Sequence, residues 1–168
     1  MGKNDIDAIL RRLVGRLAEP GYRTAYPNET EFEIDVWPRV VLLAQQLGFE
    51  CLTSHTAHPD RSVEKWQDFA QEQGGADVRA LGANNRLDIV LRNRSVGSTG
   101  IEIKCLGEDA HAGKLTQGLG QAVLGLTNRD RAVLLIHCGT VNESWRSELR
   151  NIADRICAGS RIRLVVVP

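Results

Sequence analysis

The segment from Ala132 to His137 limits the possible folds more than any other part of the chain. Its residues are almost all apolar, so it is predicted to be a strand. A strand of this kind needs both faces of its sheet covered, as in α/β proteins. Helical periodicity on either side, at Lys114–Thr127 and Glu143–Ala158, and a last strand at Arg161–Val167 complete the pattern. This order of elements predicts an α/β fold.

The N-terminal part is expected to be helical. Asp5–Ala18 carries apolar residues at helical spacing and is followed by a Pro-Gly stop. Asn28–Leu47 is ambiguous, since its first apolar residues alternate as in a strand while the later ones repeat as in a helix. We favour a helix. If it is continuous from a capping pair of Thr30 and Glu33, Pro38 lies inside it and should kink it, whereas a leading strand would put Pro38 at the first helical position.

The middle of the chain is predicted to contain one helix and several strands. A short strand at Phe49–Thr53 is followed by a helix at Ser62–Gln73. Three further strands, Val78–Leu81, Arg86–Arg92 and Gly100–Leu106, are separated by turn-rich sequences. Their short connections predict a β-meander.

Length and composition agree with one globular domain. With 168 residues, of which 42% are hydrophobic, the chain has enough apolar mass for one core. We therefore expect a single domain over residues 1–168, with an N-terminal helical extension at 1–27 and the core at 28–168. No stretch approaches the roughly 20 apolar residues of a membrane-spanning helix, and the polar N-terminus is unlike a secretory leader. A cytoplasmic protein without a membrane partner is expected.

The charge of the chain gives little support to nucleic-acid binding. The formal net charge is zero, whereas electrostatic binders of nucleic acid are strongly basic. Only four of the 21 Lys and Arg residues are lysines, so most cations are arginines, which suit bidentate phosphate contacts. The four cysteines are widely spaced without a CxxC pair, so a structural zinc site is not expected.

The strand predicted to end near residue 106 carries two ionic side chains on one face. Because side chains alternate across a strand, Glu102 and Lys104 project on one side while Ile101 and Ile103 project on the other. On the preceding strand, Asp88 stands on the face opposite its apolar neighbours, and a hairpin-like connection would bring it beside Glu102. Two carboxylates would then meet a lysine.

Two carboxylates held close together repel each other, and in a dry environment they resist ionising. A divalent cation with oxygen ligands relieves this repulsion, and magnesium is expected first, manganese next. The alternative is an ordinary half-exposed strand whose charges lie in water. A concave, partly buried acidic pocket would support an enzyme, whereas a flat solvated face would support an adaptor or immunity protein.

Three short motifs, in this order, resemble the PD-(D/E)XK nuclease superfamily, which includes restriction endonucleases and Holliday-junction resolvases. They are Arg86-Leu-Asp88-Ile-Val-Leu, Ile101-Glu102-Ile-Lys104 and Leu119-Gly-Gln121, and the similarity covers roughly Glu29 to Ile136. The resemblance implies a restriction-endonuclease-like three-layer domain with a central mixed β-sheet flanked by helices. It also implies hydrolysis of phosphodiester bonds in DNA or, less expected, in RNA.

The resemblance also assigns roles to the ionic residues. Asp88 and Glu102 would ligate a magnesium or manganese ion, with the backbone carbonyl of Ile103 nearby. Lys104 would position the attacking water and offset charge on the phosphate. Physical chemistry agrees, since a bound divalent ion lowers the pKa of its water and a lysine ammonium adds a further cation.

Many members of this superfamily carry a glutamate on the helix before the sheet, and Glu29, Glu31 and Glu33 compete for that place. Glu33 lies four residues before Trp37, on the line of apolar residues that turns inward, and Glu29 lies one turn earlier. We expect Glu33 in this role, with Glu29 as the second choice. The alternative is that all three are exposed acids that complement the helix dipole.

Gln121 resembles a glutamine that several branches carry on the helix after the second acidic strand, where its amide holds the lysine or a water. Gln117, one turn away, is a possible substitute, and a surface glutamine is the alternative. Some branches have a tyrosine one turn later, where this chain has Gly125.

Other functions stay open from the sequence. A module that kept this fold without catalysis would bind nucleic acid or another protein. The intact Asp88, Glu102 and Lys104 argue against such a loss of catalysis. A homodimer, with the N-terminal helix at its interface, would allow both strands of a duplex to be cut.

Overall fold

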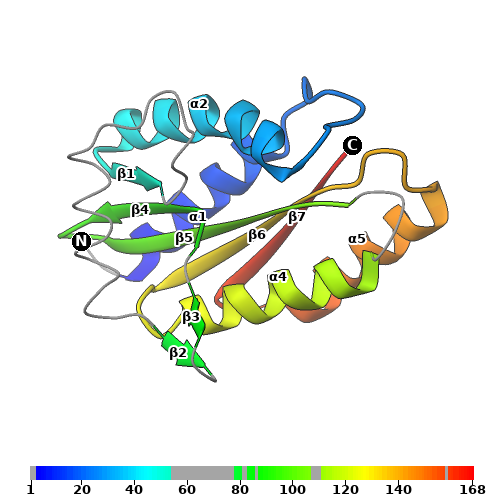
Figure 1. Ribbon diagram of the computed structural model, residues 1–168. Coiled ribbons are helices and arrows are strands. Elements are labelled where there is room, and N and C mark those ends of the chain that lie inside the picture. Colours follow the sequence, from blue (N-terminus) through cyan, green and yellow to red (C-terminus); the bar gives the residue numbers. More distant parts are fainter. Residues whose placement is uncertain (1–2, 54–77, 81–82, 86, 107–110, 158) are drawn as a thin grey trace.

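The computed structural model describes residues 3–53, 78–80, 83–85, 87–106, 111–157 and 159–168. The predicted helix Ser62–Gln73 and Arg86 of the first motif lie outside these residues. The described elements build a sheet with helices on both faces (Figure 1).

The sheet has five strands and is mixed. Its order is β1-β4-β5-β6-β7, made of Glu50–Thr53, Ile89–Asn93, Gly97–Cys105, Arg131–His137 and Ile162–Val167. Strands β1, β4 and β5 pair antiparallel, whereas β5, β6 and β7 pair in parallel. The predicted α/β class and the mixed sheet are confirmed.

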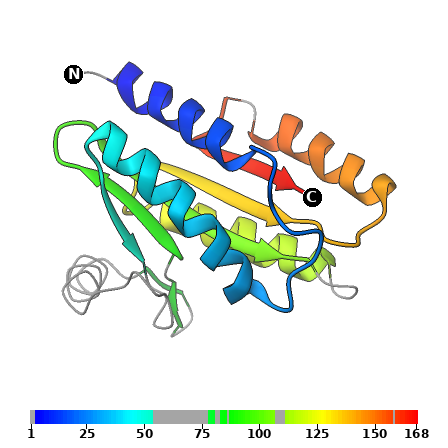
Figure 2. The same ribbon diagram turned by 90° about the horizontal axis from the view of Figure 1, so that it is seen from above.

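Helices cover both faces of this sheet. α1 (Lys3–Leu17) and α2 (Glu29–Leu47) lie on one face, and α4 (His111–Gly125) and α5 (Glu143–Cys157) lie on the other (Figures 1 and 2). The described elements therefore form three layers. A membrane crossing would need a longer and more apolar helix than any in the described part of the chain.

Strand β6 explains why both helical layers are needed. Its five apolar residues, Ala132–Ile136, are fully buried. Val133 and Leu135 belong to the apolar cluster that includes α1 and α2, whereas Leu134 and Ile136 belong to the cluster that includes α4 and α5. Burying each of the larger side chains stabilises the fold by about 1.5–3 kcal/mol before the loss of conformational entropy. The expectation that both faces of this strand are covered is confirmed.

Helix α2 runs continuously through Pro38, so the segment is a helix and not a strand. It begins earlier than the capping pair considered from the sequence. The side-chain oxygen of Asn28 accepts a hydrogen bond from the N–H of Glu31 at 3.0 Å, which satisfies one of the open donors of the first turn. Thr30 therefore lies inside the helix, and Glu29 becomes its first residue.

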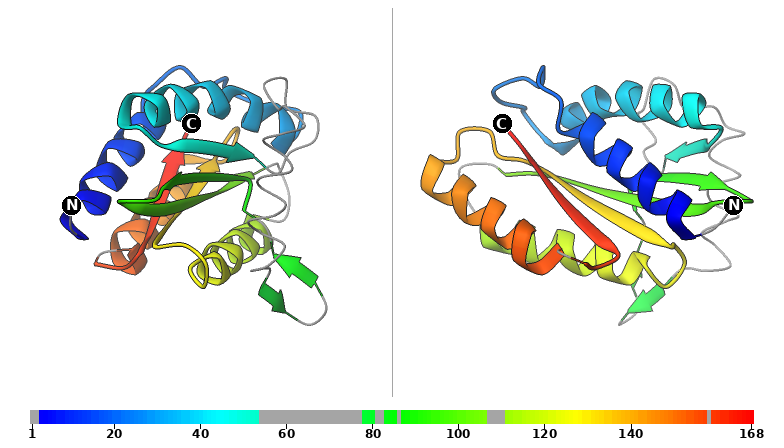
Figure 3. Two further views of the ribbon diagram at one scale, coloured as in Figure 1. Left: turned by 90° about the vertical axis from the view of Figure 1, so that its left-hand side faces the viewer. Right: turned by 180° about the vertical axis from the view of Figure 1, so that it is seen from behind.

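The predicted three-stranded meander is wrong. β2 (Val78–Ala80) pairs with β3 (Ala83–Asn85) in a separate two-stranded sheet, which lies beside α4 and apart from the main sheet (Figure 3). Strand β4 begins at Ile89 rather than at Arg86, and Asp88 lies in a bend just before it. Strand propensity does not encode which strands pair, because pairing depends on neighbours that are distant in the sequence.

Helix α4 approaches the sheet closely at Gly118. A Cβ atom on Gly118 would lie 2.7 Å from Cδ1 of Leu134 and 3.0 Å from Cγ of Lys104. Gly120, on the outer side of the same helix, has no such neighbour within 4 Å. The absence of a side chain at Gly118 therefore gives the stem of Lys104 the room that it occupies.

We predict opposite effects for alanine at these two glycines. Gly120→Ala should raise the free energy of unfolding by about 0.5–1 kcal/mol, because alanine is the better helix former and nothing obstructs it. Gly118→Ala should instead lower it by about 1–3 kcal/mol, since Leu134 and Lys104 must shift. Urea denaturation of both variants checks this, and equal stabilisation by both would contradict the close approach of α4.

Candidate active site

The pairing of β4 with β5 ends next to Asp88. Beyond that point, side-chain carboxylates accept the hydrogen bonds of the β5 backbone in place of a neighbouring strand. The ladder between β4 and β5 does not extend past the first residue of β4. Beyond it, the N–H of Ile103 donates to Oδ2 of Asp88 at 2.7 Å, and the N–H of Cys105 donates to Oε2 of Glu29 at 3.3 Å. Two carboxylates thus satisfy N–H groups at the open edge of β5 that would otherwise lose their partners.

The ammonium of Lys104 lies at the centre of this arrangement. It donates to Oε1 of Glu102 at 2.6 Å, to the carbonyl oxygen of Ile103 at 3.0 Å and to Oε1 of Glu29 at 3.1 Å. Glu102 is 0% exposed and Lys104 is 5% exposed. Ile101 and Ile103 belong to the apolar cluster on the other face of the sheet, so the predicted alternation is confirmed. We call Glu29, Asp88, Glu102 and Lys104 the Lys104 cluster.

Burial shifts the proton affinities of the Lys104 cluster. It raises the pKa of Asp88 to about 6, against the opposing effect of the Lys104 ammonium. It also raises the pKa of Glu102 to about 8, and the negative charge of Asp88 adds to this shift. Burial by itself would lower the pKa of Lys104, but the attraction of Glu102 and the other carboxylates outweighs it, so the pKa is raised. The ammonium therefore keeps its charge, while the two carboxylates bind protons at higher pH than usual.

The glutamate that α2 contributes to this cluster is Glu29. It is the first residue of the helix, and its side chain reaches Lys104 past the helix end. Glu33, the first choice from the sequence, lies one turn later and is 3% exposed, so it turns inward as expected. Helical periodicity identifies the inward face, but it does not tell which turn of the helix lies level with Lys104. Of the glutamates weighed from the sequence, Glu29, the second choice, is the one that accepts a hydrogen bond from Lys104.

Gln121 lies on the side of α4 that faces β5. It is half-buried and follows Gly118 by three residues, and Gly118 lies against the stem of Lys104. Gln117 is exposed. Of the two glutamines weighed from the sequence, Gln121 is thus the better placed to support the Lys104 cluster.

The oxygen atoms around the ammonium are of the kind that a hard divalent cation binds. They include the carboxylates of Asp88 and Glu102 and the carbonyl of Ile103. Oε2 of Glu102 is buried and has no hydrogen-bond partner among the residues that the structure describes. Such a buried oxygen is costly unless a cation or water meets it. These groups therefore fit a divalent cation.

The ammonium of Lys104 stands where these oxygen atoms converge. Within the described ranges, no group of three or more His, Cys, Asp or Glu side chains is arranged to hold a metal ion. A cation bound by Glu102 and the Ile103 carbonyl would compete directly with the ammonium for both oxygens. Lys104 would have to move aside for the cation to bind.

Two contacts near the Lys104 cluster have no local sequence signal, because each joins different elements. Lys114 of α4 donates to the carbonyl oxygen of Cys105, which brings a second cation to this end of β5. Sγ of Cys105 lies 3.7 Å from Nδ1 of His137. Burial raises the pKa of Cys105 and lowers the pKa of His137, so both favour their neutral forms. This is the opposite of a reactive thiolate beside an imidazolium, and the pair does not support a nucleophilic cysteine.

Comparison with known proteins does not assign a function to this site. No protein-family model, no curated protein and no solved structure matches the chain. The geometry and charges of the Lys104 cluster and the order of the motifs are the features that bear on its function.

We predict that Lys104→Met destabilises the protein at high pH far more than at low pH. Below about pH 6 the protonated carboxylates need no counter-charge, so the free energy of unfolding should change little. At pH 9 the variant leaves buried carboxylates unpaired, which should cost about 3–5 kcal/mol. Urea denaturation in chelator at several pH values measures both.

The control is the double variant Glu102→Gln/Lys104→Met, which removes the buried pair together. Its stability should depend on pH much less than that of Lys104→Met alone. An equal loss of stability at pH 5 and pH 9 for Lys104→Met would contradict the charge balance described above.

Proposed function

We propose that this chain is a metal-dependent endonuclease that hydrolyses phosphodiester bonds of DNA. The observation that carries the proposal is the meeting of Asp88, Glu102 and Lys104 at the open edge of β5. An ordinary solvated strand would leave these charges in water, whereas Glu102 and Lys104 are buried. Buried ionisable groups with shifted pKa values gather at functional sites, because catalysis and metal binding repay the cost of burying them.

The architecture is compatible with a restriction-endonuclease-like domain. A mixed sheet lies between helical layers, and the two acidic motifs lie at the neighbouring strands β4 and β5, followed by α4. The burial of Glu102 also argues against an adaptor that displays these charges on a flat, solvated face.

Asp88, Glu102 and the carbonyl of Ile103 would hold a magnesium or manganese ion. When bound, such an ion would lower the pKa of water and stabilise negative charge on the phosphate. Both carboxylates would have to release the protons that their raised pKa values favour. The hydrogen bond from the N–H of Ile103 orients the carboxylate of Asp88 toward the edge of β5.

Lys104 would bring positive charge to the reacting phosphate. Its shortest hydrogen bond is to Glu102, and its hydrogen bond to Glu29 would hold the ammonium beside the cluster if Glu102 bound a cation. Although burial opposes it, the surrounding carboxylates raise the pKa of Lys104, so the group stays protonated. The ammonium would then donate to the attacking water or to a phosphate oxygen, and Glu29 acts as a positioning residue.

We predict that Asp88→Asn, Glu102→Gln and Lys104→Met each reduce DNA cleavage on the order of 100-fold or more, because the first two remove a proposed metal ligand and the third removes the cation beside the reacting phosphate. Nicking of supercoiled DNA with magnesium, with manganese and with chelator measures this. Glu143→Gln is the matched control, since this carboxylate forms an exposed ion pair with Arg150 on α5. Its activity should equal that of the wild type.

The same assay distinguishes the nuclease from the main alternative, a catalytically inactive binding module. Absence of cleavage with every metal, on double-stranded DNA, single-stranded DNA and RNA alike, would contradict the enzyme. Binding of nucleic acid without cleavage would then favour an inactive module of the same fold.

We predict that magnesium and manganese bind more tightly as the pH rises from about 6 to about 8. The pKa values of Asp88 and Glu102 are raised by burial, so at lower pH the cation must displace protons. Isothermal titration calorimetry in buffers of different ionisation enthalpy measures both the affinity and the protons released. Affinity that is independent of pH over this range would contradict binding at these carboxylates.

A further inference from the structure

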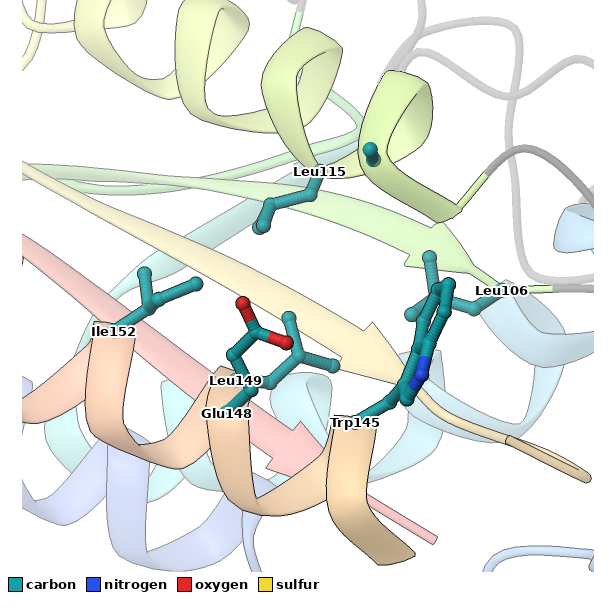
Figure 4. A pocket seen from close by; sticks show the side chains of 7 residues that line it. Leu106, Leu115, Trp145, Glu148, Leu149 and Ile152 are labelled. Atoms are coloured by element: carbon teal, nitrogen blue, oxygen red, sulfur yellow. The ribbon is translucent and has the colours of Figure 1, made fainter. Parts of the chain in front are cut away.

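A mostly apolar cavity of about 200 Å³ lies between α4 and α5, beside the end of β5 (Figure 4). Its lining includes Leu106, Leu115, Trp145, Glu148, Leu149 and Ile152. Trp145 and Ile152 stand at its two ends, and the carboxylate of Glu148 points into the space between them (Figure 4). The cavity is therefore an apolar slot with one aromatic wall and one carboxylate.

The cavity and the Lys104 cluster lie next to each other along the same side of α4. Leu115 lines the cavity, whereas Gly118, one turn later, lies against Lys104. Leu106, the residue after β5, follows Lys104 by two residues and continues the same side of the strand. Lys114, next to Leu115, is bonded to the end of β5, so a cation lies on the border between the two sites. A polymer bound at Lys104 therefore passes close to the cavity.

The indole ring of Trp145 is accessible to a ligand. It lies in the first turn of α5 and is 46% exposed, although it is one of the largest apolar side chains. The side chain of Asn142 accepts a hydrogen bond from the N–H of Trp145, which holds the backbone at this turn. An exposed indole of this kind is a platform for stacking of planar rings.

The size and chemistry of the cavity narrow the class of ligand. It is smaller than the roughly 300–1,000 Å³ of clefts that take drug-sized molecules, so it suits a single ring system. An ionised glutamate only accepts hydrogen bonds, so a ligand that reaches Glu148 must present N–H or O–H donors. In a nucleic acid, the group with a planar apolar face and N–H donors on its edge is the base.

We propose that this cavity binds one unpaired base of the nucleic-acid substrate, stacked on Trp145 and hydrogen-bonded to Glu148. This inference rests on the proposed nuclease function and assigns it a substrate class, single-stranded or locally unpaired nucleic acid. A base within a duplex is already stacked and paired, so it cannot enter the slot. Guanine is the preferred base, because its pairing edge presents two adjacent N–H donors to one carboxylate, whereas thymine and uracil present one donor between two carbonyl groups.

The test measures binding in chelator, where a metal-dependent enzyme does not cut its probe. The probes are a fluorescent oligothymidine with one central deoxyguanosine, the same strand with only thymidines, and the matching duplexes. Trp145→Ala should weaken single-strand binding on the order of 10-fold, and Trp145→Phe should restore most of it, because phenylalanine also stacks. Glu148→Gln should reduce the preference for the strand that contains guanine.

Val123→Ala is the matched control. This side chain is 54% exposed on α4 and does not line the cavity, so its removal should leave binding unchanged. Duplex binding should be the same in all variants.

The results separate this inference from the nuclease proposal. The base site would be overturned if Trp145→Ala and Glu148→Gln bound single strands as tightly as the wild type does. This holds even if metal-dependent cleavage is observed. Cleavage of duplex without any binding of single strands would overturn it as well. A change in tryptophan fluorescence that Trp145→Ala abolishes, and that N-acetyl-leucinamide causes but no mononucleotide does, would assign the cavity to a protein side chain and overturn the inference. Absence of both nucleic-acid binding and cleavage would overturn the two proposals together.

Discussion

The buried ammonium of Lys104 holds together elements that the backbone alone does not join. Its bonds to Glu102 and Glu29 connect β5 with the first residue of α2, and its stem runs beneath α4 at Gly118. Without this charge, the carboxylates of Asp88 and Glu102 would face each other with little water, at a cost of several kcal/mol for each ion. The position of α2 against the sheet therefore depends on this charge as well as on apolar packing.

Apolar packing supplies the rigid frame around that charge. Leu10, Leu13 and Leu17 of α1 are buried in the same cluster as Ile101 and Ile103, so α1 supports the face of β5 opposite the ionic side chains. The second cluster, between the sheet and helices α4 and α5, supports the other face. With both sides of the sheet covered, β5 has little freedom to shift, and the side chains on it stay in fixed relative positions.

The site exists because the sheet is incomplete at one point. Where the pairing of β5 with β4 ends at Ile89, two N–H groups of β5 have no strand partner and donate instead to Asp88 and Glu29. A regular ladder would satisfy the same groups without any carboxylate, but it would leave no opening in the sheet. Local departures from regular structure of this kind are typical of functional sites, where stability is given up for chemistry.

The sequence by itself determined the class of the fold and the chemical groups of the site. The apolar run Ala132–Ile136, the helical periodicities and the alternation around Glu102 depend on neighbours a few residues apart, so they can be recognised in the chain. The tertiary structure alone decided that Val78–Ala80 joins a separate hairpin and that Glu29 meets Lys104 across 75 residues of sequence. The physical reason is that strand pairing, and the turn of α2 that lies level with Lys104, are set by contacts between distant segments, which local propensity does not encode.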